Sequence, residues 1–187
     1  MYKFLKIFAR PLAALRQSGT QVASEPGIPS AGARASSPRH LADIREIVGQ
    51  MSESLGARLK AAGIAMDLRI PSDPLTVFLD RSGMQEVFTQ VADLACRIMP
   101  AGGTLQLLAR ADGAHAVINF MDQAPAEEPR LGRCFSAALA RRDDAAHAHS
   151  IDGVKLCEQI VSDNGGRIYA APSPLGSLGV TLRLPLC

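Results

Sequence analysis

One amphipathic helix with a sharply defined end constrains the fold of this chain more than any other feature. Within residues 82–103 the apolar side chains recur every three or four positions, which is the spacing of a helix with one buried face. Proline cannot continue the helical hydrogen-bond ladder, so the helix is expected to end before Pro100. A Gly-Gly pair then makes a turn, and residues 104–110 start a strand. The sequence therefore predicts a long helix that packs on a sheet.

Further helical and strand patterns flank this helix on both sides. Helical spacing predicts one long helix over 41–62, closed by Gly63, another over about 152–164, and a short helix around 131–141. Strand patterns with intervening turn signals occupy residues 64–70, 75–79, 104–110, 115–121, 167–171 and 179–184. The fold class expected is α/β, more narrowly an α+β two-layer sandwich, with a mixed sheet of about five strands and three long helices on one face.

Charge divides the chain into a basic beginning and a mildly acidic remainder. Residues 1–40 hold six Lys or Arg against Glu25 alone, a net charge of +5, whereas the remaining 14 basic and 17 acidic residues give −3. Residues 17–39 are rich in Gly, Pro, Ser and Ala and contain too few large apolar side chains to offset the entropy of ordering. We therefore predict a flexible basic tail and linker over 1–40 and one domain over 41–187.

The first sixteen residues admit two interpretations. Their apolar side chains fall at helical spacing between basic ones, which is typical of a short helix lying on an anionic membrane or on a partner. Pro11 interrupts that helix midway and favours a frayed basic terminus instead.

Composition excludes several classes of function. Aromatic residues make up 4% of the chain and Trp is absent, so base stacking on a nucleic acid is not expected. The four cysteines lie far apart, which indicates reduced thiols in a cytoplasmic protein, peripheral to the inner membrane if the tail binds lipid. No apolar run is long enough to span a bilayer.

The order of the motifs resembles the ATPase domain of histidine kinases, the GHKL or Bergerat fold. The resemblance covers residues 41–186: a helix ending in Pro-Ala-Gly-Gly, the strand AVINFMD, the segment QIVSDNGGRI and the final strand GVTLRLPL come in the family's order. It implies a degenerate member of that fold, similar to the C-terminal half of ATPase-like bacterial histidine phosphotransfer proteins.

The resemblance places the family's Mg²⁺-binding asparagine at Leu94 and a polar residue one turn earlier at Gln90. Leucine supplies no oxygen ligand, which a hard cation requires. Asp93 is the nearest carboxylate, but adjacent helix positions point about 100° apart. A core role for Leu94 is therefore expected, and Gln90 and Asp93 are vestigial candidates.

Asp122 is the next candidate, at the position of the acidic residue that accepts a hydrogen bond from adenine in the family. The two glycines that follow it in the family's motif are Ala124 and Ala126 here, and Pro125 stiffens the loop. The resemblance leaves two readings open: Asp122 binds adenine, or it ends a strand and caps the next turn.

Gly153 alone remains of the glycine-rich phosphate loop at the start of the last helix, and Asp152 beside it repels a phosphate. In the lid, residues 127–150, a set of His and Asp residues has spacing too loose to define a metal site, so none is expected. Catalytic residues are likewise not identified.

These departures predict that nucleotide chemistry is lost or nearly lost, with no cofactor. The expected function is that of a signalling adaptor that docks to a response regulator or a histidine kinase, and not to a nucleic acid. His40, the only histidine upstream of the domain, precedes a helix of the domain and not a dimerising hairpin, so no phosphoacceptor is identified. The alternative is a divergent ATP·Mg²⁺-binding histidine kinase domain that acts on a histidine in trans.

Overall fold

The computed structural model describes residues 38–123, 130–140, 148–172 and 178–187. The helices are α1 (Ile44–Ala61), α2 (Arg81–Ile98), α3 (Leu131–Ala140) and α4 (Ala148–Asp163). The strands are β1 (His40–Asp43), β2 (Ala65–Arg69), β3 (Thr76–Leu79), β4 (Thr104–Asp112), β5 (His115–Gln123), β6 (Arg167–Pro172) and β7 (Leu178–Pro185).

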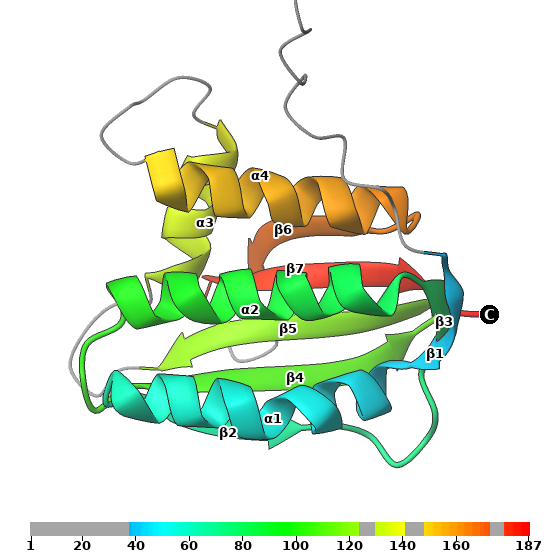
Figure 1. Ribbon diagram of the computed structural model, residues 1–187, viewed down its shortest axis with the longest axis horizontal. Helices are drawn as coiled ribbons and strands as arrows, with labels where there is room; N and C mark the ends of the chain where they lie inside the picture. The colour runs from blue at the N-terminus through cyan, green and yellow to red at the C-terminus, as the bar shows by residue number, and fades with distance from the viewer. Residues whose placement is uncertain (1–37, 124–129, 141–147, 173–177) are drawn as a thin grey trace, which may run out of the picture. The chain divides into compact units, whose positions relative to one another are not determined.

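Five of the strands form one mixed sheet in the order β2-β4-β5-β7-β6. The edge strand β2 runs parallel to β4, and the other neighbours are antiparallel, with β4 and β5 joined by the predicted tight turn. Figure 1 shows α1, α2 and α4 lying side by side across one face of this sheet. This arrangement confirms the expected α+β two-layer fold, and the predicted short helix is present as α3.

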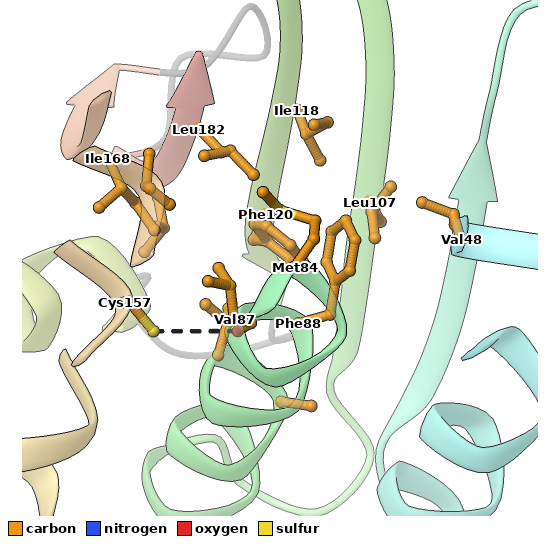
Figure 2. Close-up of a cluster of buried hydrophobic side chains, with 14 of the residues drawn as sticks. Val48, Met84, Val87, Phe88, Leu107, Ile118, Phe120, Cys157, Ile168 and Leu182 are labelled. Carbon is orange, nitrogen blue, oxygen red and sulfur yellow. Dashed lines mark hydrogen bonds between the residues drawn. The ribbon is translucent and has the colours of Figure 1, made fainter. Parts of the chain in front are cut away.

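The core lies between α2 and the central strands. On α2, Phe88 points at Phe120 of β5, with ring centroids 5.6 Å apart and the planes tilted by 55° (Figure 2). Side chains from β4, β7 and α4 close around this pair. Burial of the α2 face predicted from its periodicity is confirmed, because Val87, Phe88 and Val91 are each at most 1% exposed.

The prediction that the first helix begins at Leu41 is wrong. Residues 40–43 form β1, which pairs antiparallel with β3 in a separate two-stranded sheet, so β3 does not join the main sheet. Leu41 lies opposite Phe78 and is 66% exposed. The helix begins only after Asp43, whose carboxylate accepts a hydrogen bond from the Arg45 amide at 2.9 Å and caps the helix N-terminus. The last helix also starts earlier than predicted, at Ala148.

The C-terminus of α4 matches its sequence signal. Gly165 has φ of 74°, and its amide donates to the Ser162 carbonyl while the Gly166 amide donates to that of Val161. This pair of bonds satisfies carbonyls that the helix end would otherwise leave unpaired, and only glycine adopts the left-handed conformation at little cost. The turn sends the chain back along the sheet as β6.

Candidate functional site

Helix α2 carries three of the positions singled out from the sequence and lies between α1 and α4 (Figure 1). Asp80 caps its N-terminus by accepting a hydrogen bond from the Ser82 amide at 3.0 Å. The helix ends at Ile98, directly before the Met99-Pro100 boundary that the sequence predicts. Gln90, Asp93 and Leu94 therefore project from the middle of one continuous helix.

Gln90 and Gly153 are brought together. A methyl group added to Gly153 would overlap Oε1 of Gln90, so the α4 backbone and the Gln90 side chain are in close contact. The Gln90 amide nitrogen donates to Oε1 of Glu86 at 2.8 Å, which fixes the side chain along α2. The space beside the first turns of α4, where the resemblance puts phosphates, is thus partly filled by the Gln90 amide.

Asp93 is directed away from this pair. Its carboxylate lies 2.9 Å from Nη1 of Arg58 on α1, in an ion pair at a half-exposed position. The two side chains join α1 to α2 on the side opposite α4. Asp93 is therefore engaged in a surface contact and is not placed with Gln90 and Gly153.

Leu94 is a core residue, as expected, with 3% of its surface exposed. It lies in the same buried cluster as Val91 and Ala95. An aliphatic side chain presents no lone pair, so the position reserved for an Mg²⁺ ligand in the family does not fit the ion here.

Asp122 ends the buried part of β5 and is 3% exposed. Its Oδ2 accepts hydrogen bonds from the backbone amides of Arg130 and Leu131, the latter at 3.2 Å. These amides open α3, so Asp122 caps that helix, and the capping interpretation is the one the contacts support. Its other oxygen, Oδ1, is buried and has no hydrogen-bond partner among the residues that the structure describes.

Several positions that the sequence analysis singled out lie outside the described residues. Ala124, Pro125 and Ala126 belong to the undescribed stretch 124–129. Of the lid, residues 130–140 are described, but three of its His and Asp residues fall in 141–147, and the side chains of 148–151 are likewise not described. Among the described residues no three His, Cys, Asp or Glu side chains gather where they could hold a metal ion. In the same part of the chain no helix is long and apolar enough to cross a membrane.

Sequence reasoning missed the role of Asn164. It is 5% exposed, its Oδ1 accepts a hydrogen bond from the Asp80 amide at 2.7 Å, and its Nδ2 donates to the Ile160 carbonyl at 2.7 Å. One side chain thus ties the end of α4 to the cap of α2. The sequence signal for this role was an asparagine before Gly-Gly. The same pattern is typical of a helix C-terminus whose asparagine makes no such link.

The thiol of Cys157 on α4 faces α2 and is part of the core. Cys157 is 1% exposed and its sulfur lies 3.9 Å from the Val87 carbonyl oxygen (Figure 2). Burial, with a smaller contribution from the charge of Glu86, raises the pKa of this thiol to about 12. It stays protonated and packs as a small apolar side chain.

A mixed sheet of this order, covered on one face by three long helices, is the fold of a histidine-kinase ATPase-type domain. No protein-family model matches the chain. The resemblance to this fold stated from the sequence is confirmed.

Among curated proteins, the chain is 30% identical over 133 residues to the signal transduction histidine-protein kinase BaeS of Escherichia coli (strain K12). It is 28% identical over 120 residues to the adaptive-response sensory kinase SasA of Synechococcus sp. (strain JA-3-3Ab). The matches cover 69% and 63% of this chain but 28% and 32% of these relatives. The chain thus corresponds to about a third of each kinase at most.

Solved structures show the same fold. The nucleotide-free catalytic domain of histidine kinase ThkA superposes with a TM-score of 0.62 at 14% identity, over 80% of this chain and 97% of that one. ThkA in complex with the response regulator protein TrrA gives 0.59 at 13% identity, over 80% of this chain and 42% of that one.

Proposed function

We propose that this chain is a non-catalytic signalling adaptor, built on a degenerate histidine-kinase ATPase-type domain, that docks to partners of two-component signalling. The observation that supports this most is Leu94. At 3% exposure it places apolar atoms where the resemblance puts an oxygen ligand for Mg²⁺. Without this ligand, the chain lacks the family's means of holding the Mg²⁺ that neutralises the nucleotide phosphates.

Two further contacts support the same proposal. The Gln90 amide lies against Gly153 and takes part of the space beside α4. Of the two nearby carboxylates on α2, that of Asp93 is paired with Arg58, and that of Glu86 accepts a hydrogen bond from the Gln90 amide. Restoring a Mg·ATP site would therefore require rearrangement on both sides of α2.

A titration by calorimetry tests the loss of nucleotide binding. We expect no measurable heat when Mg·ATP or Mg·ADP is added, and a nucleotide-binding histidine kinase catalytic domain serves as the positive control. Saturable, Mg²⁺-dependent heat would contradict the proposal.

The unpartnered Oδ1 of Asp122 supports the second candidate, a divergent kinase domain that binds ATP and acts on a histidine in trans. A buried acceptor without a donor costs free energy that a ligand amino group could recover. Adenosine alone distinguishes the candidates, because it needs no metal ligand. Binding of adenosine that Asp122→Asn abolishes, followed by transfer of phosphate from ATP to a histidine kinase hairpin, would establish the kinase.

The partner we propose is a response regulator or a histidine kinase. This rests on the structural likeness to ThkA, whose complex with the response regulator TrrA has been solved. Binding of purified receiver domains, measured with and without phosphorylation, tests it. A cytoplasmic location, and contact of residues 1–16 with an anionic membrane, remain part of the proposal.

A further inference from the structure

The second face of the five-stranded sheet carries a line of arginines. In the strand registers, Arg110 of β4 lies opposite Val117 of β5, Val117 opposite Arg183 of β7, and Arg183 opposite Arg167 of β6. Residues directly opposite one another share a face of the sheet, whereas their chain neighbours point to the other. The neighbours Ile118, Leu182 and Ile168 belong to the core under the helices, so this line lies on the face away from α1, α2 and α4. We call Arg110, Arg183 and Arg167 the arginine row.

Among the residues that the structure describes, one carboxylate, that of Asp112, forms ion pairs with the row. Oδ2 of Asp112 lies 3.6 Å from Nη1 of Arg110 and 3.5 Å from Nη1 of Arg183, and all three side chains are between 37% and 44% exposed. Arg167 is exposed and has no ion-pair partner among the residues that the structure describes. Three guanidinium groups against one carboxylate leave surplus positive charge at this end of the sheet.

The pairing of Arg167 with Arg183 is unfavourable in the isolated domain. They are directly opposite in neighbouring strands, which lie about 4.8 Å apart. Like charges opposite one another destabilise a sheet. Asp112 offsets the charge of Arg183 in part, but the structure describes no ion-pair partner for Arg167. A local conflict of this kind is expected at functional surfaces.

An aromatic ring extends the row. Tyr169 follows Arg167 by two residues on β6, so it shares the same face, and it is 36% exposed. Tyrosine and arginine are the residue types that most often contribute strongly to protein interfaces. We propose that the arginine row and Tyr169 dock an acidic surface of a partner protein, whose carboxylates pair with the guanidinium groups as Asp112 already does.

Charge favours a protein over a nucleic acid or a lipid surface. The row is short, because it spans three strand spacings, about 14 Å. Residues 41–187 carry a net charge of −3, so an extended polyphosphate or anionic membrane would meet repulsion beyond the row. This inference takes from the proposed function only that the partner is a protein. It holds whether or not the domain binds nucleotide.

Fluorescence anisotropy with labelled poly-L-glutamate tests this at low salt. We expect Arg167→Glu/Arg183→Glu to weaken binding about tenfold or more, since charges at the contact dominate such association. Lys60→Glu/Arg97→Glu makes the same change of net charge at exposed positions on the helices α1 and α2, and should change binding by less than about twofold. Arg167→Thr should weaken binding while leaving the unfolding midpoint unchanged or higher, because it removes the like-charge pair.

Three results would overturn the inference: no binding by the wild-type chain, equal weakening in both double variants, or tighter binding to single-stranded DNA or anionic vesicles with the same dependence on Arg167 and Arg183. Each double variant is first shown to unfold at the wild-type midpoint. Nucleotide binding in the calorimetric titration would contradict the proposed loss of nucleotide chemistry and leave the arginine row untouched.

Discussion

At the residue scale, position 94 can serve either the stability of the core or the binding of Mg²⁺. Leu94 occupies a position on α2 that the resemblance reserves for an oxygen ligand, yet its side chain is almost fully buried in an apolar cluster. An aliphatic group there stabilises the domain by burial and removes the means of holding Mg²⁺. Stability and nucleotide chemistry thus place opposite demands on this position.

Leu94→Asn is expected to lower the free energy of unfolding. An unpaired buried amide costs roughly 1–3 kcal/mol, and the lost apolar burial adds about 1 kcal/mol. Denaturant titration measures the change, and Leu94→Met, which keeps the volume, should cost less than about 1.5 kcal/mol. If Leu94→Asn instead kept full stability and gained Mg·ATP binding, an open nucleotide cavity would have to exist beneath it.

Asp43 makes part of the stability dependent on pH. Burial opposes its ionisation, but hydrogen bonds from the Arg45 side chain and from the Arg45 and Leu75 amides, with the Arg45 charge, hold the pKa of the carboxyl below its ordinary value. A group with a depressed folded pKa contributes its full stability above the unfolded pKa of about 3.9 and loses it as the pH falls through the folded value.

We therefore expect the free energy of unfolding to drop below about pH 4 more steeply in the wild-type chain than in Asp43→Asn. Asparagine still caps α1 but cannot ionise. Denaturant midpoints measured across the acid range check this. Parallel pH curves for the two proteins would show that the Asp43 carboxylate contributes nothing through its charge.

At the scale of elements, one amide side chain links the end of α4 to the start of α2. Asn164 joins the C-terminus of α4 to the Asp80 amide that precedes α2. Asn164→Ala leaves that amide without its acceptor, and we expect a loss of roughly 1–3 kcal/mol in unfolding free energy. Thermal unfolding measures it, and the exposed neighbour Ser162→Ala should stay within about 0.5 kcal/mol of wild type. Similar effects from both substitutions would argue against the bond.

Elements with strong local periodicity could be predicted from the sequence, and those that depend on distant pairing could not. The spacing on α2 and the turn signals before β6 and between β4 and β5 describe short-range geometry. Leu41 continued the helical pattern of the residues after it, but its strand is formed by hydrogen bonds to β3, more than thirty residues away.

The candidate site likewise has features that could be predicted from the sequence and features that could not. Burial of Leu94 followed from its place on a periodic helix. The contact of Gln90 with Gly153, and the ion pair that turns Asp93 toward Arg58, depend on how two other helices pack against α2. For Asp122, the sequence left adenine binding and capping open because both need only a carboxylate at the end of a strand.

At the scale of the whole molecule, the charge asymmetry yields a prediction for residues 1–16. Their basic and apolar side chains favour association with anionic liposomes that weakens as salt rises. Liposome sedimentation of the full chain and of a variant lacking these residues measures it. A variant that sediments like the full chain would leave the segment without a role at membranes.

The short strand β3 is held from both sides by the ends of the domain. On one side His40 of β1 pairs with Leu79, and on the other Leu186 bridges to Val77 while the Cys187 amide donates to the Thr76 carbonyl. Residues 42 and 186 both lie opposite Val77, so they are about two strand spacings, or 10 Å, apart. A linker of a few residues can close that gap, so the domain can be circularly permuted at the Asp112-Gly113 turn or inserted whole into a surface loop of another protein.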